Sequence, residues 1–281
     1  MKLLRYGAAG AERPGLLDDQ GRIRDLSAHV QDIDGAALAP SMLQRLRGIP
    51  VDTLPLVEGQ PRIGACVGRV GKLICSGLNY ADHAAESNMD VPSEPLLFMK
   101  ATSALCGAHD DIIRPPGAQK LDWEVELAIV IGTRAQRVQE ADALSHVAGY
   151  CVINDVTERS YQLERGGQWM KGKSCDSFAP LGPWMVTADE VGSPNALDLW
   201  LDVDDTRRQS GNTRTMVFPV AVLVAYVSQF MTLEPGDVIA TGTPPGVGMG
   251  MKPEPVYLKD GQWVRAGIQG LGEQRQRVVR A

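Results

Sequence analysis

The segment LDWEVELAIVIG, residues 121–132, constrains the fold more than any other stretch of this chain. Successive side chains of a strand point to opposite faces, so Asp122, Glu124 and Glu126 share one face. Beyond Glu126 both faces become apolar through residues 127–131, which is typical of a strand buried on both sides. The chain therefore directs acidic side chains along a strand that enters a core, where their charge needs a partner.

Size and composition narrow the possible classes of protein. The 281 residues are enough for one large domain, or for a main domain with a small one. A net charge of −6 and the lack of a Lys/Arg block argue against nucleic acid as a partner. The longest apolar run, residues 218–227, is too short to span a membrane, and the start of the chain has no secretory pattern. Five cysteines without a C-x-x-C pair predict reduced thiols in a cytoplasmic protein.

The order of the expected elements predicts an α+β fold that is mainly β. We expect a small N-terminal domain over residues 1–68 and a main domain over residues 69–281. Apolar runs between Gly/Pro turns predict strands at 73–78, 96–100, 123–131, 148–153, 183–187, 197–203, 237–241 and 256–258. Helical patterns are few, at 34–48, 80–88, 156–164 and 217–231. Because strands and helices do not alternate, a folded-over β-sheet is favoured over a Rossmann or TIM-barrel layout.

The acidic face of the strand at 121–132 is the first candidate site. Side chains two residues apart on a strand lie roughly 6–7 Å apart, and two carboxylates there repel each other unless a cation or a shared proton separates them. Magnesium takes oxygen ligands from a few carboxylates and keeps positions open for substrate. The D-x-E-x-E pattern alone fits a solvent-facing edge equally well. The apolar continuation favours a metal, because solvation of Glu126 would be hard to sustain.

A second candidate follows the apolar run YCVIN, which ends at Asp155. Asp155, Arg159 and Gln162 are spaced at i, i+4 and i+7, on one face of the helix predicted there. The pair Asp155–Arg159 taken alone is a surface ion pair of little worth. An aspartate at the end of a core strand is also a suitable third ligand for a cation bound by Glu124 and Glu126.

Two further stretches carry groups suited to acid–base or anion chemistry. In MKGKSCD, Lys173 lies between Gly-flanked turns and can reach an anionic substrate as a point charge, with Lys171 as the alternative. In NYADHAAES, Asn79 can cap a helix on which His83 and Glu86 are i, i+3 neighbours. A carboxylate beside an imidazole makes a general base near neutral pH, whereas the alternative is a solvated helix face.

The loop in PGDVIATGTPPGVGMG, residues 235–250, is the fourth candidate. Loops rich in Gly and Pro expose backbone N–H groups that can hold a carboxylate or a developing oxyanion. The loop lacks the G-K-[ST] ending of a phosphate loop. Taken alone it reads as a β-turn.

Together these stretches resemble the fumarylacetoacetate hydrolase family. Its pattern is followed in order, over about residues 70–280, by GLNYADHAAE, EPLLFMK, DWEVELAIVIG, AGYCVINDVTER, QWMKGKSCDSFAPLGPWMVT and PGDVIATGTPPGVG. The resemblance implies a mixed β-sandwich roll with a small N-terminal α/β domain, found as a homodimer.

The resemblance also implies roles for individual residues. It implies Mg²⁺ or Mn²⁺ held by Glu124, Glu126 and Asp155, with Asp122 outside the ligand set. It further implies a dyad on a mobile lid helix and a set of substrate or oxyanion contacts. The dyad would be His83 and Glu86, and the contacts would come from Arg159, Gln162, Lys173 and Thr241.

Within the family, several stretches are similar to hydrolases of sugar-acid catabolism that act on 2,4-diketo-3-deoxy-L-fuconate or -L-rhamnonate, a branch often labelled ureidoglycolate lyase. These stretches are MKLLRYG, RPGLLDDQGRIRDLS, IGACVG, ERGGQWMKGK, GNTRTMVF and TPPGVGMGMKP. Two stretches, CDSF in place of the more usual FDTF and LDVDDTRRQSGN, depart from that branch and leave the substrate open.

The activity that this likeness implies is that of an acylpyruvase. The enzyme would cleave the C3–C4 bond of a 2,4-dioxo acid to pyruvate and a second acid, which is L-lactate for the fuconate derivative. The alternatives are a ureidoglycolate lyase, an oxaloacetate decarboxylase or a 2-oxo acid isomerase of the same family, and a non-catalytic domain that binds a small acid. In each case the expected partner is a small 2-oxo acid or a related acid.

Overall fold

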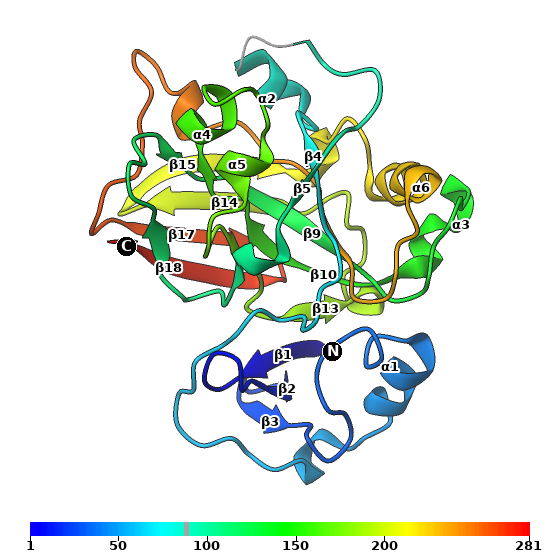
Figure 1. The fold of residues 1–281 in the computed structure, drawn as a ribbon. Coiled ribbons are helices and arrows are strands. Elements are labelled where there is room, and N and C mark those ends of the chain that lie inside the picture. Colours follow the sequence, from blue (N-terminus) through cyan, green and yellow to red (C-terminus); the bar gives the residue numbers. More distant parts are fainter. Residues whose placement is uncertain (87–89) are drawn as a thin grey trace.

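The computed structural model describes residues 1–86 and 90–281, and the side chains of residues 83–85 are outside the described part. A nine-stranded mixed sheet runs through the molecule (Figure 1). In spatial order its strands are β3 (Ile23–Asp25), β2 (Arg13–Leu17), β1 (Lys2–Tyr6), β13 (Met185–Thr187), β10 (Val147–Asn154), β9 (Val125–Ile131), β16 (Val238–Ala240), β4 (Leu73–Gly77) and β5 (Leu96–Lys100).

A second sheet packs against the middle of the first. Its strands, in spatial order, are β15 (Thr206–Asn212), β14 (Asp198–Val203), β17 (Trp263–Ile268), β18 (Gly272–Arg280) and β7 (Ile112–Arg114). Contacts of β14 and β17 with β9, and of β17 and β18 with β10, place the core between the two sheets. Two short ladders complete the strands: β11 (Thr157–Glu158) with β8 (Leu121–Asp122), and β12 (Ala179–Pro180) with β6 (Leu105–Cys106). This strand-dominated, mixed architecture confirms the predicted fold class.

The helices are short and lie around the sheets. They are α1 (Pro40–Arg47), α2 (Ala81–Glu86), α3 (Glu140–Ala143), α4 (Arg159–Leu163), α5 (Met170–Lys173) and α6 (Val220–Phe230). Single 3₁₀ turns occur at Val51–Thr53, Thr102–Ala104, Leu144–His146, Ala188–Glu190, Thr213–Thr215 and Gly248–Gly250. Helices α2, α4 and α5 gather on one side of the molecule, at the top of the view in Figure 1. Within the described chain, no helix is long and apolar enough to cross a membrane.

Strand β9 is buried along its whole length, as its apolar sequence predicts. It lies between β10 and β16, and both pairings are antiparallel. The ladder between β9 and β10 starts at Val125. At this start, two side chains accept hydrogen bonds from backbone N–H groups. The Asn154 Oδ1 accepts from the Glu124 N–H at 3.0 Å, and the Gln209 Oε1 accepts from the Val125 N–H at 3.0 Å. These contacts hold the backbone at the point where the acidic side chains emerge.

The N-terminal strands form a lobe of their own, at the bottom of the view in Figure 1. Strand β1 pairs with β13, with Leu3 opposite Met185, so the nine-stranded sheet is continuous between this lobe and the main body. The domain boundary at residues 68 and 69 stays a prediction.

The structure differs from the expected elements in several places. The predicted helix at 156–164 begins only at Arg159, because residues 157 and 158 pair as β11 with β8, and the Glu158 side chain caps the helix by accepting from the Ser160 N–H. Asp155 therefore does not share a helix with Arg159. The segment 256–258 forms no strand, and strands β7, β15, β17 and β18 of the second sheet were not predicted.

Candidate metal centre and substrate cavity

Three carboxylates converge in the interior of the main body. One oxygen from each of Glu124, Glu126 and Asp155 lies within 4.8 Å of the others, and all three side chains are buried. The sheet explains this convergence: Ile153, near the end of β10, pairs with Glu126 at the start of β9, so Asp155 follows β10 directly beside the two glutamates. The structure thus brings together the three residues that were expected to bind metal.

Three cationic side chains surround this carboxylate cluster. The Lys173 Nζ lies 2.6 Å from the Glu124 Oε2 and 2.7 Å from the Asp155 Oδ2, and the Arg159 Nη2 lies 2.6 Å from the Glu124 Oε1. The remaining oxygen of Asp155 is paired with the Nζ of Lys100, whose side chain is fully buried. Lys100 was not among the expected site residues, although EPLLFMK does end an apolar strand on a lysine.

The charge around Glu126 is the least compensated in the cluster. Burial raises its pKa well above the usual range, and the nearby charges of Asp155 and Glu124 raise it further. A backbone N–H from Gly242 donates to the Glu126 Oε2 at 2.7 Å and offsets part of this effect. Burial would lower the pKa of Lys173, but Asp155 and Glu124 outweigh it and raise that pKa above its usual value. Lys173 is therefore cationic throughout the neutral range.

Asp122 has a different role from the three clustered acids. Its Oδ2 accepts from the Arg159 Nε at 2.8 Å and from the Met249 N–H at 3.0 Å, and its Oδ1 accepts from the Gly248 N–H at 2.6 Å. Arg159 is thereby held between Asp122 and Glu124, and the pair Asp155–Arg159 considered from the sequence does not form. Asp122 connects the loop after β16 to the arginine of the site.

A cavity of about 120 Å³ opens beside the carboxylate cluster. Five of the expected site residues line it: Glu124, Glu126, Arg159, Gln162 and Lys173. The Gln162 Oε1 accepts from the Arg159 Nη1 at 3.1 Å, so these two side chains present one continuous polar edge.

The threonine at the cavity is not the one expected from the sequence. Gly242 and Thr243 line the cavity, whereas the Thr241 hydroxyl donates to the Leu127 carbonyl at 3.0 Å and lies outside the lining. The Leu127 carbonyl also accepts from the Thr241 N–H, so Thr241 is tied to the backbone of β9 and its hydroxyl is engaged there. The Thr243 hydroxyl donates to the Val125 carbonyl at 2.9 Å.

The two residues of the expected dyad lie on α2. The side chain of His83 is outside the described residues, so its contacts are not part of the structure. The Glu86 carboxylate accepts from the Gly246 N–H at 3.0 and 3.1 Å, which ties the helix to the Gly/Pro loop after β16. Lys171 is exposed, and its Nζ donates to the Arg165 carbonyl at 2.7 Å, so Lys173 is the lysine inside the site.

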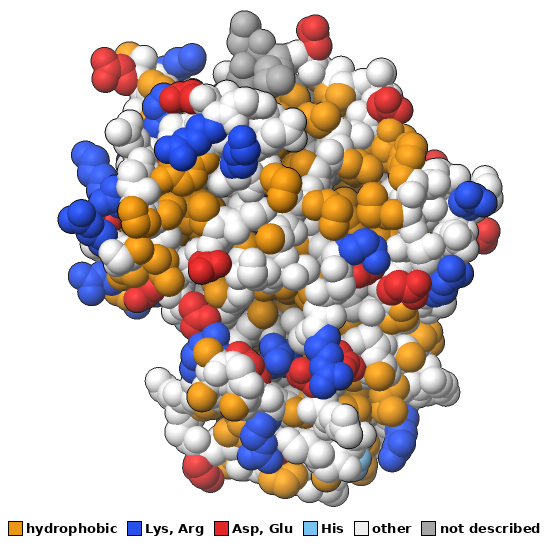
Figure 2. Space-filling view, viewed as in Figure 1, with side chains coloured by type: hydrophobic (Ala, Val, Ile, Leu, Met, Phe, Trp, Pro, Cys, Tyr) orange, Lys and Arg blue, Asp and Glu red, His pale blue; other side chains and the backbone are white. Residues whose placement is uncertain are grey.

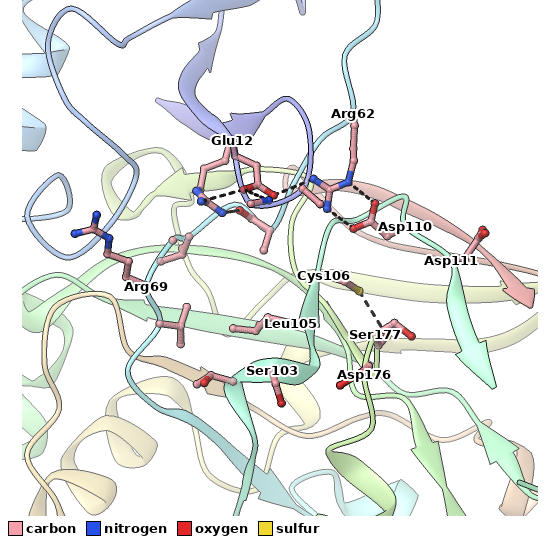
Figure 3. A pocket seen from close by; sticks show the side chains of 18 of the residues that line it. Glu12, Arg62, Arg69, Ser103, Leu105, Cys106, Asp110, Asp111, Asp176 and Ser177 are labelled. Carbon is pink, nitrogen blue, oxygen red and sulfur yellow. Dashed lines mark hydrogen bonds and ion pairs between the residues drawn. The ribbon is translucent and has the colours of Figure 1, made fainter. Parts of the chain in front are cut away.

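A larger cleft, of about 660 Å³, lies between the N-terminal lobe and the main body (Figure 3). Several of its charged side chains form ion pairs: Arg62 binds both Asp110 and Glu12, and Arg5 binds Asp32. Figure 2 shows basic and acidic side chains gathered where the lobe meets the main body. The pair Arg62–Asp110 joins the lobe to the main body, and the described residues of the cleft show no converging acids like those beside the smaller cavity.

The carboxylate cluster fits a hard divalent cation. Its donors are all oxygens, they converge, and the repulsion at Glu126 is the kind that a bound cation relieves. Four buried carboxylates face three buried cations here (Asp122, Glu124, Glu126 and Asp155 against Lys100, Arg159 and Lys173), which leaves one net negative charge.

The fold and the site together define a class: a mixed-β protein with a buried carboxylate cluster, suited to a divalent cation, beside a small cavity. The family model described as fumarylacetoacetate (FAA) hydrolase C-terminal matches residues 72–279. The chain belongs to the fumarylacetoacetate hydrolase family.

Relatives and solved structures agree with this assignment. A protein of Burkholderia ambifaria named "Putative hydrolase" is 67% identical over 98% of each chain. A fumarylacetoacetate hydrolase from Exiguobacterium antarcticum is 38% identical, with a TM-score of 0.86 and full coverage of both chains. A maleylpyruvate hydrolase from Sphingobium sp. SYK-6, in complex with manganese(II) and pyruvate, is 30% identical, with a TM-score of 0.84 and full coverage of both. A probable 2-hydroxyhepta-2,4-diene-1,7-dioate isomerase from Mycobacterium abscessus is 32% identical, with a TM-score of 0.85, over 100% of this chain and 99% of that one.

Proposed function

We propose that this protein is a metal-dependent hydrolase that cleaves the C3–C4 bond of a 2,4-dioxo acid of the acylpyruvate type. The observation that carries the proposal is the convergence of Glu124, Glu126 and Asp155 beside a cavity that also holds Lys173 and Arg159. A structural neighbour whose crystal contains manganese(II) and pyruvate supports a 2-oxo acid as the common part of the substrate.

The polar half of the cavity suits the head of such a substrate. A 2-oxo acid offers a carboxylate and an oxo oxygen next to each other. Lys173 and Arg159 supply positive charge, and Gln162 supplies an amide, along one edge of the cavity. Mg²⁺ or Mn²⁺, when bound by the three carboxylates, supplies the further positive charge that polarises the 2-oxo group.

The remaining steps are assigned to side chains of the chain itself. His83, oriented by Glu86, removes a proton from a water molecule that adds to the C4 carbonyl. Lys173, Arg159 and Gln162 stabilise the negative oxygen that develops at C4. The C3–C4 bond then breaks, its electron pair stays with the three-carbon fragment, and protonation at C3 gives pyruvate. The other product is the acid formed from the acyl group.

Helix α2 carries both residues of the proposed dyad, and its contacts bear on the position of the base. Because Glu86 binds the Gly246 N–H, a helix that carries both dyad residues is docked on the loop beside the cavity. Docking of this kind keeps bulk water away from the reacting carbons and sets the position of the base.

The proposal also covers the particular substrate, the assembly and the alternative activities. The sugar-acid substrate 2,4-diketo-3-deoxy-L-fuconate belongs to the proposed class, and a homodimer is the expected assembly. Isomerisation or decarboxylation of a 2-oxo acid is the main alternative, since one neighbour is named as an isomerase. The proposed dyad of His83 and Glu86 favours hydrolysis, because isomerisation requires no activated water. Release of glyoxylate and urea from ureidoglycolate would identify the lyase alternative.

The test is release of pyruvate from a set of acylpyruvates in the presence of Mg²⁺, with oxaloacetate and ureidoglycolate as alternative substrates. Glu124→Ala is expected to abolish both metal binding and turnover while the protein stays folded. His83→Ala is expected to bind metal normally and to lose hydrolysis. Full hydrolysis by His83→Ala would overturn the assignment of the base.

A matched pair of lysine variants separates site chemistry from surface charge. Lys173→Met removes a buried cation that contacts Glu124 and Asp155, whereas Lys171→Met removes an exposed cation from the same helix. Only the first is expected to lose activity, by more than about 100-fold. Equal activity of the two variants would contradict the role given to Lys173.

A further inference from the structure

We propose that the far end of the substrate cavity takes a short, uncharged acyl group and excludes a second carboxylate. This inference rests on the proposed function, because it concerns the part of a 2,4-dioxo acid beyond C4. It would separate this chain from a maleylpyruvate hydrolase, whose substrate carries a carboxylate at that end.

The lining of the cavity combines charged and apolar side chains. We call the acids and cations described above its polar half, and Leu78, Phe98, Leu163, Trp169 and Met249 its apolar half. The ring of Phe98 is at the junction, since Lys173 Nζ lies 5.1 Å from its centroid. A substrate whose 2-oxo acid head reaches the carboxylate cluster therefore places its acyl group along the apolar half.

Trp169 is held in place by its neighbours. Its ring meets Phe98 edge to face, with centroids 5.4 Å apart. A Cβ at Gly77 would lie only 2.9 Å from the Trp169 ring, so the glycine allows the indole to lie close against the end of β4. The apolar wall is thus built by packing, and Ser76, whose buried hydroxyl has no hydrogen-bond partner among the described residues, also lines the cavity.

No cation is available at this end of the cavity. Among the described residues that line it, the only Lys or Arg are Arg159 and Lys173, and both contact the carboxylates at the polar end. The sequence from residue 73 to residue 99, which includes α2 and the segment after it, contains no Lys or Arg but has four acidic residues. That segment therefore supplies no lysine or arginine that could pair with an anionic acyl group.

The size of the cavity favours a short group. Its volume of about 120 Å³ is smaller than the roughly 150 Å³ of an apolar cavity that holds benzene. A 2-oxo acid head occupies much of this space, so only a few carbon atoms remain for the acyl group. A hydroxyl on that group is expected to cost less than a carboxylate, because transfer of a neutral polar group out of water costs less than transfer of a charge.

The experiment compares two inert acids of equal length on the Mg²⁺-loaded protein. Binding of 2-oxopentanoate and of 2-oxoglutarate, which differ only in a terminal carboxylate, is measured by calorimetry at constant ionic strength. We expect 2-oxopentanoate to bind at least about ten-fold more tightly, because the second carboxylate would lose water without gaining a partner. Equal or tighter binding of 2-oxoglutarate would overturn the inference.

Variants at neighbouring positions test whether the apolar wall causes the preference. Trp169→Ala is expected to weaken binding of 2-oxopentanoate by about five-fold or more and to leave 2-oxoglutarate nearly unchanged. Trp169→Phe keeps an apolar ring and is expected to retain most of the preference. Met170→Ala is the control, because Met170 is 56% exposed and does not line the cavity. An undiminished preference in Trp169→Ala would show that the wall does not cause it.

Turnover distinguishes failure of the inference from failure of the proposed function. Propionylpyruvate, its 5-hydroxy derivative and maleylpyruvate are compared by kcat/KM, and we expect the first two to exceed the third by at least about ten-fold. Rapid cleavage of maleylpyruvate would overturn the inference and leave the hydrolase assignment intact. Absence of all hydrolysis, together with the binding preference, would overturn the proposed function and leave the inference intact.

Discussion

Replacing Glu126 by glutamine is expected to change the stability of the metal-free and metal-bound protein in opposite directions. Glu126 is 2% exposed, and its Oε2 accepts from the Gly242 N–H, a bond that a glutamine oxygen can also accept. The substitution therefore removes a charge while it keeps the size of the side chain and its main hydrogen bond.

The size of the effect follows from the spacing of the carboxylates. At the 4.8 Å that bounds the cluster, two like charges repel by about 3.5 kcal/mol at an effective dielectric constant of about 20. Glu126 faces two such charges, on Glu124 and Asp155, and Lys173 offsets part of their effect. The raised pKa of Glu126 also lets a proton relieve the repulsion, so we expect a net gain of only about 1–2 kcal/mol in the free energy of unfolding of the metal-free variant.

With saturating Mg²⁺, we expect the wild-type protein to be more stable than the Glu126→Gln variant. Glutamine is a neutral and weaker ligand, and even the outer hydrogen-bond partners of metal ligands are worth about 10–100-fold in affinity, so we expect Mg²⁺ to bind the variant at least about 100-fold more weakly. Because Mg²⁺ binds the folded state and not the unfolded chain, saturating Mg²⁺ raises the free energy of unfolding of the wild-type protein. The variant binds Mg²⁺ weakly and gains little.

The assay is urea unfolding with a chelator and, in parallel, with saturating Mg²⁺. Glu254→Gln, at an exposed position outside the site, is the control and is expected to match wild type in both conditions. The reasoning is refuted if metal-free Glu126→Gln is less stable than wild type, or if Mg²⁺ stabilises both proteins equally.

Three further predictions concern other parts of the chain. Lys100→Met leaves Asp155 with one cation fewer in a buried site, so we expect the metal-free protein to lose about 2–4 kcal/mol in urea unfolding and Mg²⁺ to restore much of it; unchanged stability would contradict the pairing. Burial lowers the pKa of His109, so the unfolded chain takes up its proton first as the pH falls below about 6.5. Thermal unfolding should therefore show wild type losing stability over that range and His109→Gln losing less. Gly77→Ala should displace the Trp169 ring and weaken binding of 2-oxopentanoate in calorimetry, with Mg²⁺ affinity unchanged; unaltered 2-oxopentanoate binding would argue against the contact.

The acidic cluster could be anticipated because its cause is local. Two glutamates at alternate positions of an apolar strand must point into the core together, and an aspartate at the end of another apolar strand can join them only if the strands are neighbours. The antiparallel pairing of β9 with β10 meets that condition.

Features that depend on distant contacts could not be anticipated in this way. Lys100 reaches the site only because β5 lies next to β4 at the edge of the nine-stranded sheet. Strand β18 was missed because its inward positions include Gln274 and Gln276, both fully buried, where an apolar alternation was sought. The Gln274 amide donates to three backbone carbonyls, and the Gln276 amide donates to a fourth. Hydrogen bonding to the backbone replaces apolar packing there, and no pattern of hydrophobicity records it.

The contacts of Glu124 connect the metal site to the recognition of substrate. One of its oxygens is bound to Arg159 and the other to Lys173, so both oxygens of an expected ligand are already engaged by cations of the chain. Glu124 can ligate a metal ion only by giving up or sharing one of these contacts. The cation that is released lies at the edge of the cavity, where the carboxylate of a 2-oxo acid would be bound. Binding of the metal and binding of the acid should therefore strengthen each other, because linkage between two sites is reciprocal. Lys100, which is bound to the outer oxygen of Asp155 and does not line the cavity, would take no part in this exchange and would keep Asp155 in position in both states.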